Sequence, residues 1–353
     1  MKKNKYLISA VPLNGHILMK FLTERLRLKG YKIICKEQDE SIYSLLEKKK
    51  YFSIINFFIK KKIWEIYVYV FILIKRNSII MFLWPQILGL DLVLRSTKHN
   101  KVILYIMDNF FFCIRSYNVH PITNNECLDC LGSVNPHKLC LPFPKKYPKS
   151  KNIKYLELFK NSGDKFTFYS QNKLQKILLK KHFGNNINVK LVGMNFGEVK
   201  KSQEFIKSKR LGYDIVFHNK SIIAKGLLYI IKIAEFLPEK SFLIPDDKKN
   251  VLKIINSKKN LPSNITFQKM DWESGLKEQV TSARLVINPS IWSAPVESAL
   301  IRSMTFNQNI ATVRTIFGYE NEIKSIKNHI RLSTNTMIAS KQIKEFFKKK
   351  FSS

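Results

Sequence analysis

Residues 283–304 read ARLVINPSIWSAPVESALIRSM, which predicts a buried strand ending at Pro289-Ser290 and a helix that opens near Pro295. The N-terminus of a helix that follows a strand favours anions, because its free N–H groups and its dipole both attract negative charge. Glu297 lies in the first turn, where it can accept hydrogen bonds from a sugar diol or simply interact with the helix dipole. The stretch therefore indicates a ligand site at the carboxyl edge of a parallel sheet.

The same alternation of strand and helix extends outward from this stretch. In the second half of the chain, strands are expected near residues 214–217, 241–244, 265–268, 285–288, 310–313 and 330–333. In the first half, strands are expected near residues 5–11, 31–35, 78–83, 101–107, 166–169 and 189–192. Repeated β–α units of this kind predict an α/β fold of two Rossmann-like lobes that face each other across a cleft.

The length of 353 residues also suits two domains. We expect the first lobe over residues 1–205, with an irregular loop at residues 108–150, and the second over residues 206–335. The polar, lysine-rich stretch at residues 195–210 is the expected linker.

Composition indicates a folded and strongly basic protein. Hydrophobic residues make up 45% and charged residues 25%, which excludes a disordered chain, and five cysteines are too few for a disulfide scaffold. The formal charge of +35 is spread along the chain and suits nucleic acid, an anionic membrane or an anionic substrate, or it reflects only a coding bias toward lysine. No known nucleic-acid-binding motif accompanies the charge, so we expect no nucleic-acid partner. Since no secretory signal is visible, we expect cytoplasmic localisation.

Residues 41–76 combine clustered lysines with aromatic side chains. Lys48–Lys50 and Lys60–Lys62 alternate with rings such as Phe52 and Trp64. This pattern is typical of a segment at a bilayer interface, where rings lie at headgroup depth and lysines meet anionic lipid. We expect peripheral contact with the inner face of an anionic membrane through residues 41–76, with a core helix that has a solvated lysine face as the alternative.

The start of the second half carries another candidate element of a ligand site. The strand at residues 214–217 is followed by Lys220, Lys225 and Gly226, where an apolar helix begins. Two ammonium groups on one strand–helix turn can hold a diphosphate as point charges. In so lysine-rich a chain, two solvated lysines are the plain alternative.

The order of these pieces resembles the donor-binding half of family-4 retaining glycosyltransferases of the GT-B fold. Lys225-Gly226 matches the family's Lys-Gly, and Asn219-Lys220 stands where Gly-Arg is usual. Asn288-Pro289-Ser290 matches the strand end. Glu297 matches the second of two glutamates eight residues apart, whereas Pro289 stands where the first would be.

The resemblance implies that the second lobe binds a nucleotide sugar, with Glu297 on the ribose and Lys220 and Lys225 on the diphosphate. It implies that the first lobe binds the acceptor and that a final helix at residues 336–353 packs back on that lobe. A late Gly-Tyr-Glu-Asn-Glu turn from Gly318 adds Glu322 to the site. The residues assigned to the donor are Lys220, Lys225, Ser290, Ser293, Glu297 and Glu322.

In the first lobe, the resemblance concerns the candidate catalytic residues. Asp108 remains from the family's His-Asp pair, with Met107 in place of the histidine, and His16 follows the first strand in its glycine-containing turn. We expect His16 and Asp108 to be catalytic, with an ordinary surface position as the alternative for His16.

Four of the five cysteines fall in the irregular loop, with a C-x-x-C core. Four thiolates can bind a structural zinc, with His120 and His137 as alternate ligands, and unligated cysteines are the other interpretation. We expect no cofactor for the transfer reaction itself. The candidate zinc ligands are Cys113, Cys127, Cys130 and Cys140.

The sequence thus predicts a glycosyltransferase that moves a sugar from a nucleotide-diphosphate donor to a glycan or lipid-linked glycan, in bacterial surface polysaccharide synthesis. Two alternatives remain open. One is a non-catalytic scaffold of the same fold, suggested by the absent first glutamate and by Met107. The other is a basic nucleic-acid-binding protein, suggested by the net charge alone.

Overall fold

The computed structural model describes residues 3–13, 17–36, 45–46, 48–193, 212–256, 260–323 and 328–351. The chain divides into two compact units, and the second unit includes a short segment from the irregular loop. Unit 1 comprises Met1–Ser116 and Asp129–Gly197, and unit 2 comprises Tyr117–Leu128 and Glu198–Ser353. The expected linker at residues 195–210 lies outside the described residues.

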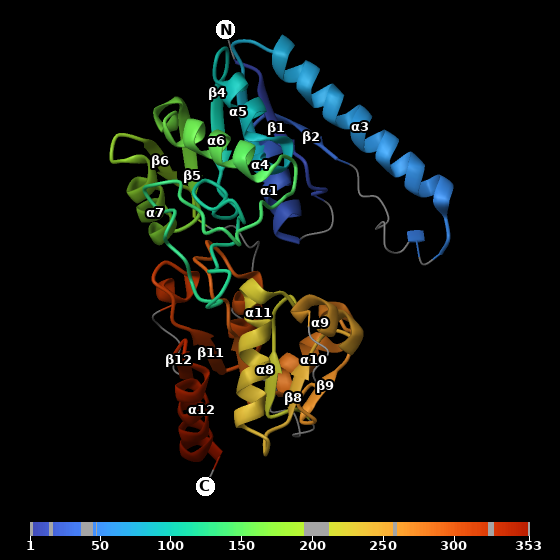
Figure 1. Ribbon diagram of the computed structural model, residues 1–353, viewed down its shortest axis with the longest axis vertical. Helices are drawn as coiled ribbons and strands as arrows, with labels where there is room; N and C mark the ends of the chain where they lie inside the picture. Colours follow the sequence, from blue (N-terminus) through green and yellow to red (C-terminus); the bar gives the residue numbers. More distant parts are fainter. Residues whose placement is uncertain are drawn as a thin grey trace. The chain divides into compact units, whose positions relative to one another are not determined.

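Unit 1 is built on a parallel six-stranded sheet in the order β2-β1-β3-β4-β5-β6 (Figure 1). Its central strands are almost wholly buried runs of apolar residues, as expected for a parallel sheet that helices cover. The strands are β1 (Lys5–Ser9), β2 (Tyr31–Cys35), β3 (Ile79–Leu83), β4 (Lys101–Tyr105), β5 (Phe166–Ser170) and β6 (Asn188–Leu191).

The helices of unit 1 bury their apolar sides against this sheet. Leu22 and Leu26 of the first helix, for example, pack with Leu7, Met81 and Ile103 of the strands. The helices are α1 (Ile17–Leu28), α3 (Tyr51–Ile74), α4 (Pro85–Leu88), α5 (Leu90–Ser96), α6 (Lys149–Lys160) and α7 (Lys173–Phe183), with a short 3₁₀ turn η1 (Gly163–Lys165).

Helix α3 is an exception within unit 1, because most of its apolar residues are exposed. It runs along one side of the unit, and of its residues only Val68 and Ile72 are buried (Figure 1). The ring of Phe71 packs edge-on against Tyr6 of β1, with 4.9 Å between the centroids. The C-terminal half of the helix is therefore the part that anchors it. No helix in the described ranges is both long and apolar enough to cross a membrane.

Unit 2 repeats the architecture with a parallel six-stranded sheet in the order β12-β11-β10-β7-β8-β9. Its strands are β7 (Ile215–Phe217), β8 (Phe242–Ile244), β9 (Ile265–Phe267), β10 (Leu285–Asn288), β11 (Asn309–Val313) and β12 (Asn328–Leu332). Its helices are η2 (Ile223–Lys225), α8 (Leu227–Phe236), α9 (Lys248–Ile255), η3 (Trp272–Leu276), α10 (Lys277–Ser282), α11 (Ser298–Phe306), η4 (Tyr319–Glu322) and α12 (Thr336–Phe351). The predicted strands are thus all present, in two Rossmann-like lobes.

The last helix, α12, packs on α8 within unit 2. Its buried Ala339, Ile343 and Phe347 join the core that also contains Ile230 and Ile233 of α8. The hydroxyl of Tyr229 in α8 donates to the carbonyl oxygen of Ser333, at 2.5 Å, just before the helix. The apolar side of α12 is therefore used inside unit 2, and its expected contact with the first lobe stays a prediction.

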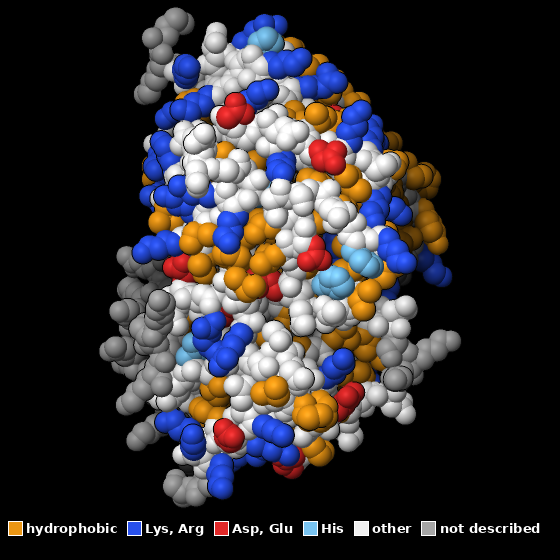
Figure 2. Space-filling model, turned by 60° about the vertical axis from the view of Figure 1, so that its left-hand side comes forward, with side chains coloured by type: hydrophobic (Ala, Val, Ile, Leu, Met, Phe, Trp, Pro, Cys, Tyr) orange, Lys and Arg blue, Asp and Glu red, His pale blue; other side chains and the backbone are white. Residues whose placement is uncertain are grey.

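The basic residues on the face that Figure 2 shows are scattered. Figure 2 shows Lys and Arg side chains in many small groups on the visible face, with apolar and uncharged side chains between them. Such a distribution matches the charge that the sequence spreads along the chain.

Candidate functional site in unit 2

The candidate site begins with a close approach between the turn after β7 and the end of β10. Gly226 has a φ of +85°, and a Cβ atom there would lie 2.1 Å from the carbonyl oxygen of Pro289. The backbone N–H of Ile291 also donates to the carbonyl oxygen of Ala224, at 3.0 Å. Only glycine permits this contact, because any side chain would collide with the backbone in a conformation that L-residues rarely adopt. The approach brings Lys225 beside the Pro289-Ser290 turn.

Lys225 and Glu297 form a mostly buried ion pair at the centre of this site. The ammonium group of Lys225 contacts Oε1 of Glu297, and the two side chains are 14% and 5% exposed. The hydroxyl of Ser290 donates to the same Oε1 at 2.8 Å, and the amide of Asn219 donates to that hydroxyl at 3.1 Å. Because both charges have lost most of their water, they depend on each other and on these hydrogen bonds.

Several polar atoms of this cluster have capacity for a ligand. None of the described residues bonds to Oε2 of Glu297, since both of its partners use Oε1. In the described part of the chain, the buried Nε1 of Trp292 and Oγ of Ser221 also have no hydrogen-bond partner. Such orphaned polar atoms are rare in folded proteins and mark places where water or a ligand completes the bonding. The ring of Trp292 lies 5.0 Å from the Lys225 ammonium, so its orphaned group belongs to the same cluster.

The cluster gathers four of the donor-site residues suggested by the sequence into neighbouring loops: Lys225, Ser290, Ser293 and Glu297. Lys220 lies in the same turn after β7, but its side chain is exposed. Its backbone N–H donates to the side-chain oxygen of Asn219 at 3.0 Å. The binding of a diphosphate by Lys220 and Lys225 and of a ribose by Glu297 stays a prediction.

In the turn after β11, the buried glutamate is Glu320 and not Glu322, which the sequence suggested for the site. Glu322 is exposed, whereas Glu320 is buried and accepts hydrogen bonds from the Thr315 N–H, at 2.9 Å, and from the Thr315 hydroxyl. Burial raises the pKa of Glu320 to about 7, although its hydrogen bonds with Thr315 oppose the shift. A Cβ at Gly318 would lie 2.2 Å from the side-chain oxygens of both Thr315 and Glu320, so a larger residue there would displace these side chains. Glu320 thus fixes the shape of the turn.

Ser293 is buried in contact with the segment 117–128, which the sequence did not connect with this site. Asn118 donates to the Ser293 hydroxyl at 2.8 Å and accepts from the Ser293 N–H at 3.0 Å. Glu126 accepts from the Ser293 hydroxyl. The ring of Tyr117 packs edge-on against Trp292, with 4.6 Å between centroids. These residues lie about 170 positions away in the chain, so no local pattern could have indicated them.

In unit 1, the predicted catalytic Asp108 lies just beyond β4 and is buried. It accepts hydrogen bonds from the Phe110 N–H at 3.0 Å and from the Gln86 amide at 2.9 Å, and among the described residues it has no ion-pair partner. Burial raises its pKa to about 7, with the two hydrogen bonds opposing the shift. The predicted His16 lies outside the described residues.

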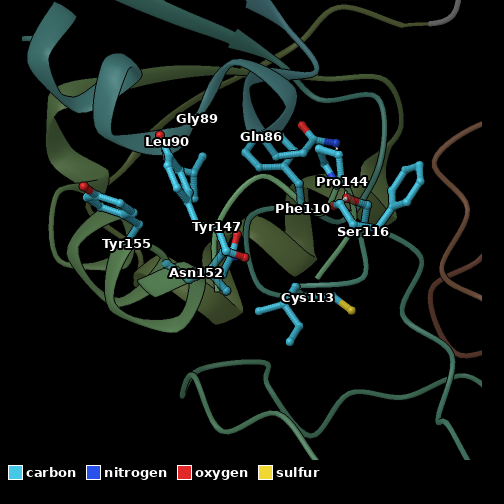
Figure 3. A pocket seen from close by; sticks show the side chains of 13 residues that line it. Gln86, Gly89, Leu90, Phe110, Cys113, Ser116, Pro144, Tyr147, Asn152 and Tyr155 are labelled. Atoms are coloured by element: carbon cyan, nitrogen blue, oxygen red, sulfur yellow. Dashed lines mark hydrogen bonds between the residues drawn. The ribbon is translucent and has the colours of Figure 1, made fainter. Parts of the chain in front are cut away.

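Asp108 is connected through Gln86 to a small pocket of unit 1. The Gln86 amide also donates to the hydroxyl of Ser116, at 3.2 Å (Figure 3). Gln86, Ser116 and Cys113 line the pocket together with the rings of Phe110 and Tyr147. Asp108 therefore lies behind the pocket wall and contacts it through the Gln86 amide. A catalytic role of Asp108 stays a prediction.

The four loop cysteines do not form a set of metal ligands. Throughout the described ranges, no three His, Cys, Asp or Glu side chains are grouped so that they could hold a metal ion. Cys127 belongs to unit 2, while the other three cysteines belong to unit 1. Burial raises the pKa of the Cys130 thiol to about 11. A structural zinc stays a prediction.

Comparison with solved structures shows the fold class of the chain. It is similar to Anabaena Alr3699/HepE in complex with UDP-glucose, with a TM-score of 0.59 and 10% identity over 98% of this chain and 90% of that one. It is also similar to sucrose-phosphate synthase of Thermosynechococcus elongatus, with a TM-score of 0.57 and 10% identity over 98% and 90%. These likenesses confirm the predicted fold, with two Rossmann-like lobes of the GT-B type.

A further neighbour is longer than this chain. The match to S. aureus TarM has 14% identity and a TM-score of 0.46, and it covers 80% of this chain but only 55% of TarM. In sequence, no protein-family model and no curated protein matches the chain.

Proposed function

We propose that the chain is a glycosyltransferase that moves a sugar from a nucleotide-diphosphate donor to a glycan or lipid-linked glycan acceptor, in the synthesis of bacterial surface polysaccharide. The Lys225–Glu297 pair at the carboxyl edge of the unit 2 sheet carries this proposal. Ligands of open α/β sheets bind at this edge. The similarity to the HepE structure, which was solved with UDP-glucose, supports the same class of donor.

The chemistry of the pair suits a nucleotide sugar. Lys225 offers positive charge to a diphosphate leaving group, so that charge developing on departure is stabilised without a metal. Oε2 of Glu297 can accept hydrogen bonds from a ribose diol while Oε1 keeps its present partners. We also propose retention of anomeric configuration, which the match of Lys225-Gly226 and Glu297 to the family pattern supports.

A thermal-shift screen tests this function, with UDP, GDP and ADP and their sugars as probes. We expect at least one nucleoside diphosphate to raise the melting temperature, because a ligand at a hundredfold excess over its Kd stabilises the native state by about 2.7 kcal/mol. Lys225→Met and Glu297→Gln should each reduce that shift, with the melting temperature without ligand measured for each variant. A wild-type protein that responds to none of the probes contradicts the proposal.

The chain offers a matched control for these two variants. Lys344 and Glu239 form an exposed pair at 3.8 Å, with side chains 53% and 49% exposed. Lys344→Met and Glu239→Gln change the same charges at the surface of unit 2 and should leave the nucleotide shift unchanged. If the control variants reduce the shift as much as the site variants, then general charge rather than the site holds the ligand.

We propose in addition that the enzyme works at the surface of an anionic membrane, with helix α3 as the contact. By the 3.6-residue helical period, one stripe of α3 lies opposite the buried Val68 and Ile72, and every residue of the stripe is exposed. Lys60 and Lys62 flank the stripe and are also exposed. The stripe consists of Phe52, Ile55, Ile59, Ile63, Ile66, Val70, Leu73 and Ile74.

A lipid surface suits this helix better than water does. Phe52 is 90% exposed and Ile63 is 62% exposed, although apolar side chains of this size favour burial by roughly 1.5–3 kcal/mol each. An apolar stripe between lysines is the arrangement of a helix that lies in the plane of an anionic bilayer. Such a position brings the enzyme to a lipid-linked acceptor.

A further inference from the structure

Glu126 brings a carboxylate from the irregular loop to the carboxyl edge of the unit 2 sheet. Its Oε1 accepts from the hydroxyl of Ser293 and from the N–H of Phe317, the latter at 3.1 Å. Its Oε2 accepts from the N–H of Ile316. Ser293 follows β10 and Ile316 follows β11, which are neighbours in the sheet, so this one carboxylate bridges two adjacent loops.

These three donors fix the orientation of the carboxylate and still leave room for another. Two of them are backbone N–H groups, which cannot rotate away, so the group is held in place before any ligand arrives. An ionised carboxylate has about four lone-pair sites, so roughly one acceptor site remains. Glu126 is only partly buried, and a ligand can therefore reach it.

The segment that carries Glu126 is braced against the loop that contains Trp292. Asn118 bonds to both the hydroxyl and the N–H of Ser293, and Tyr117 packs on the Trp292 ring. The same ring also lies close to the Lys225 ammonium, 5.0 Å from its centroid. The carboxylate of Glu126 and the Lys225–Glu297 pair therefore flank the same short loop after β10.

We propose that Glu126 recognises the sugar of the donor by accepting a hydrogen bond from a ring hydroxyl. This inference rests on the proposed function, and it names the substrate class. A neutral sugar satisfies the remaining acceptor site, whereas the carboxylate of a uronic acid would meet a like charge held close by two loops. The enzyme therefore uses neutral hexosyl donors and rejects uronosyl donors.

Binding measurements with paired donors test the assignment. The probes are UDP, UDP-glucose and UDP-glucuronic acid, together with GDP, GDP-mannose and GDP-mannuronic acid, and the readouts are Kd and melting temperature. For the nucleotide that the wild type binds, we expect the neutral sugar donor to bind more tightly than the uronic acid donor, by at least about tenfold. In Glu126→Gln that preference should shrink to about threefold or less, because the like charge is gone.

Glu126→Ala separates sugar recognition from nucleotide binding. It should bind the neutral donor at least about tenfold more weakly than the wild type while its affinity for the free nucleoside diphosphate stays within twofold. Asp129→Ala is the matched control, since it removes an exposed carboxylate three residues away and should change neither affinity.

The outcomes distinguish this inference from the function on which it rests. If the wild type binds a nucleoside diphosphate and Glu126→Ala keeps full affinity for the neutral donor, the inference is wrong and the proposed function stands. If Glu126→Ala weakens free nucleotide and nucleotide sugar equally, Glu126 only anchors the segment, and the inference is again wrong. If the wild type binds no nucleotide, both are wrong.

Discussion

The two units have the same sheet architecture, but the buried carboxylates at the carboxyl edges of their sheets have different partners. In unit 1 this edge buries Asp108 with hydrogen bonds and without a described cation, whereas in unit 2 it buries Glu297 against Lys225. Unit 1 also exposes the apolar stripe of α3, while unit 2 uses the apolar side of its long helix α12 in its own core. The comparison teaches that one fold can support two kinds of surface, with a buried ion pair at the site in unit 2 and an exposed apolar helix in unit 1.

Glycines at helix ends give the sharpest test of how closely the unit 2 site is packed. Gly226 in unit 2 has a φ of +85°, and Gly184 in unit 1 has a φ of +92°. A Cβ at Gly184 would meet no atom within 4 Å. Gly184→Ala should therefore cost only the backbone strain, about 1 kcal/mol. Gly226→Ala adds a collision with the Pro289 backbone, so we expect the free energy of unfolding to fall by about 4 kcal/mol or more.

Urea unfolding of the full chain measures both variants. Nucleotide binding should also fall in Gly226→Ala, because the turn that carries Lys225 must move away from Ser290. Equal costs for the two substitutions would mean that the close approach in unit 2 does not constrain the chain.

Substitutions in α3 and α12 test whether the exposed apolar residues of unit 1 differ in function from those of unit 2. Replacing Phe52, Ile59 and Ile63 of α3 together by serine removes three side chains from one stripe and should weaken binding to anionic vesicles on the order of 100-fold. Met337 and Ile338 of α12 are 53% and 52% exposed and provide the control in unit 2, where serine substitutions should have little effect.

Vesicle co-sedimentation gives the measurement, with phosphatidylcholine alone compared with phosphatidylcholine containing phosphatidylglycerol. Because Lys60 and Lys62 flank the stripe, the wild type should prefer the anionic vesicles, and salt should weaken that preference. Binding that survives the triple substitution would place the lipid contact elsewhere on the chain.

A pH series tests the buried carboxyl of unit 1. The pKa of Asp108 is raised to about 7, whereas the unfolded chain releases the same proton near its ordinary value of about 4. Between these pH values the native state binds more protons than the unfolded state, so the contribution of Asp108 to stability is present at low pH and is lost as pH rises toward 7. Asp108→Asn cannot lose a proton. The free energy of unfolding of the variant should therefore rise relative to that of the wild type by about 1–3 kcal/mol as the pH goes from 5 to 8.

The same variant at pH 5 is its own control, because both side chains are then neutral in the native state. The orphaned Oε1 of Gln86 can accept a hydrogen bond from the new amide if the Gln86 side chain turns over. His182 of unit 1, whose pKa burial lowers to about 4, raises stability as pH rises toward 6.5 and does so equally in both proteins. A difference between variant and wild type that is the same at pH 5 and pH 8 would show that Asp108 does not titrate in this range.

Much of the fold could be predicted from the sequence because a buried parallel strand requires a continuous apolar run. The central strands are present for this reason, whereas the edge strand β6 is mostly exposed and not continuously apolar. Gly226 and Pro289 already indicated where the turns of unit 2 lie. Local chemistry also predicted a role for Lys225 and Glu297, which the structure pairs. The predicted turn from Gly318 contains a short 3₁₀ helix, η4, in which Glu320 bonds back to Thr315.

What only the tertiary structure decided is which distant groups meet. The sequence could not show that residues 117–128 belong to unit 2, nor that Glu126 reaches the N–H groups of Ile316 and Phe317, because such contacts join segments about 190 residues apart. It suggested Glu322 where Glu320 is buried, since burial depends on the packing of a turn rather than on spacing. It grouped four cysteines by their spacing, but two units of the fold share them. Apolar periodicity is a local property of the chain, whereas burial and charge pairing are properties of its folded neighbours.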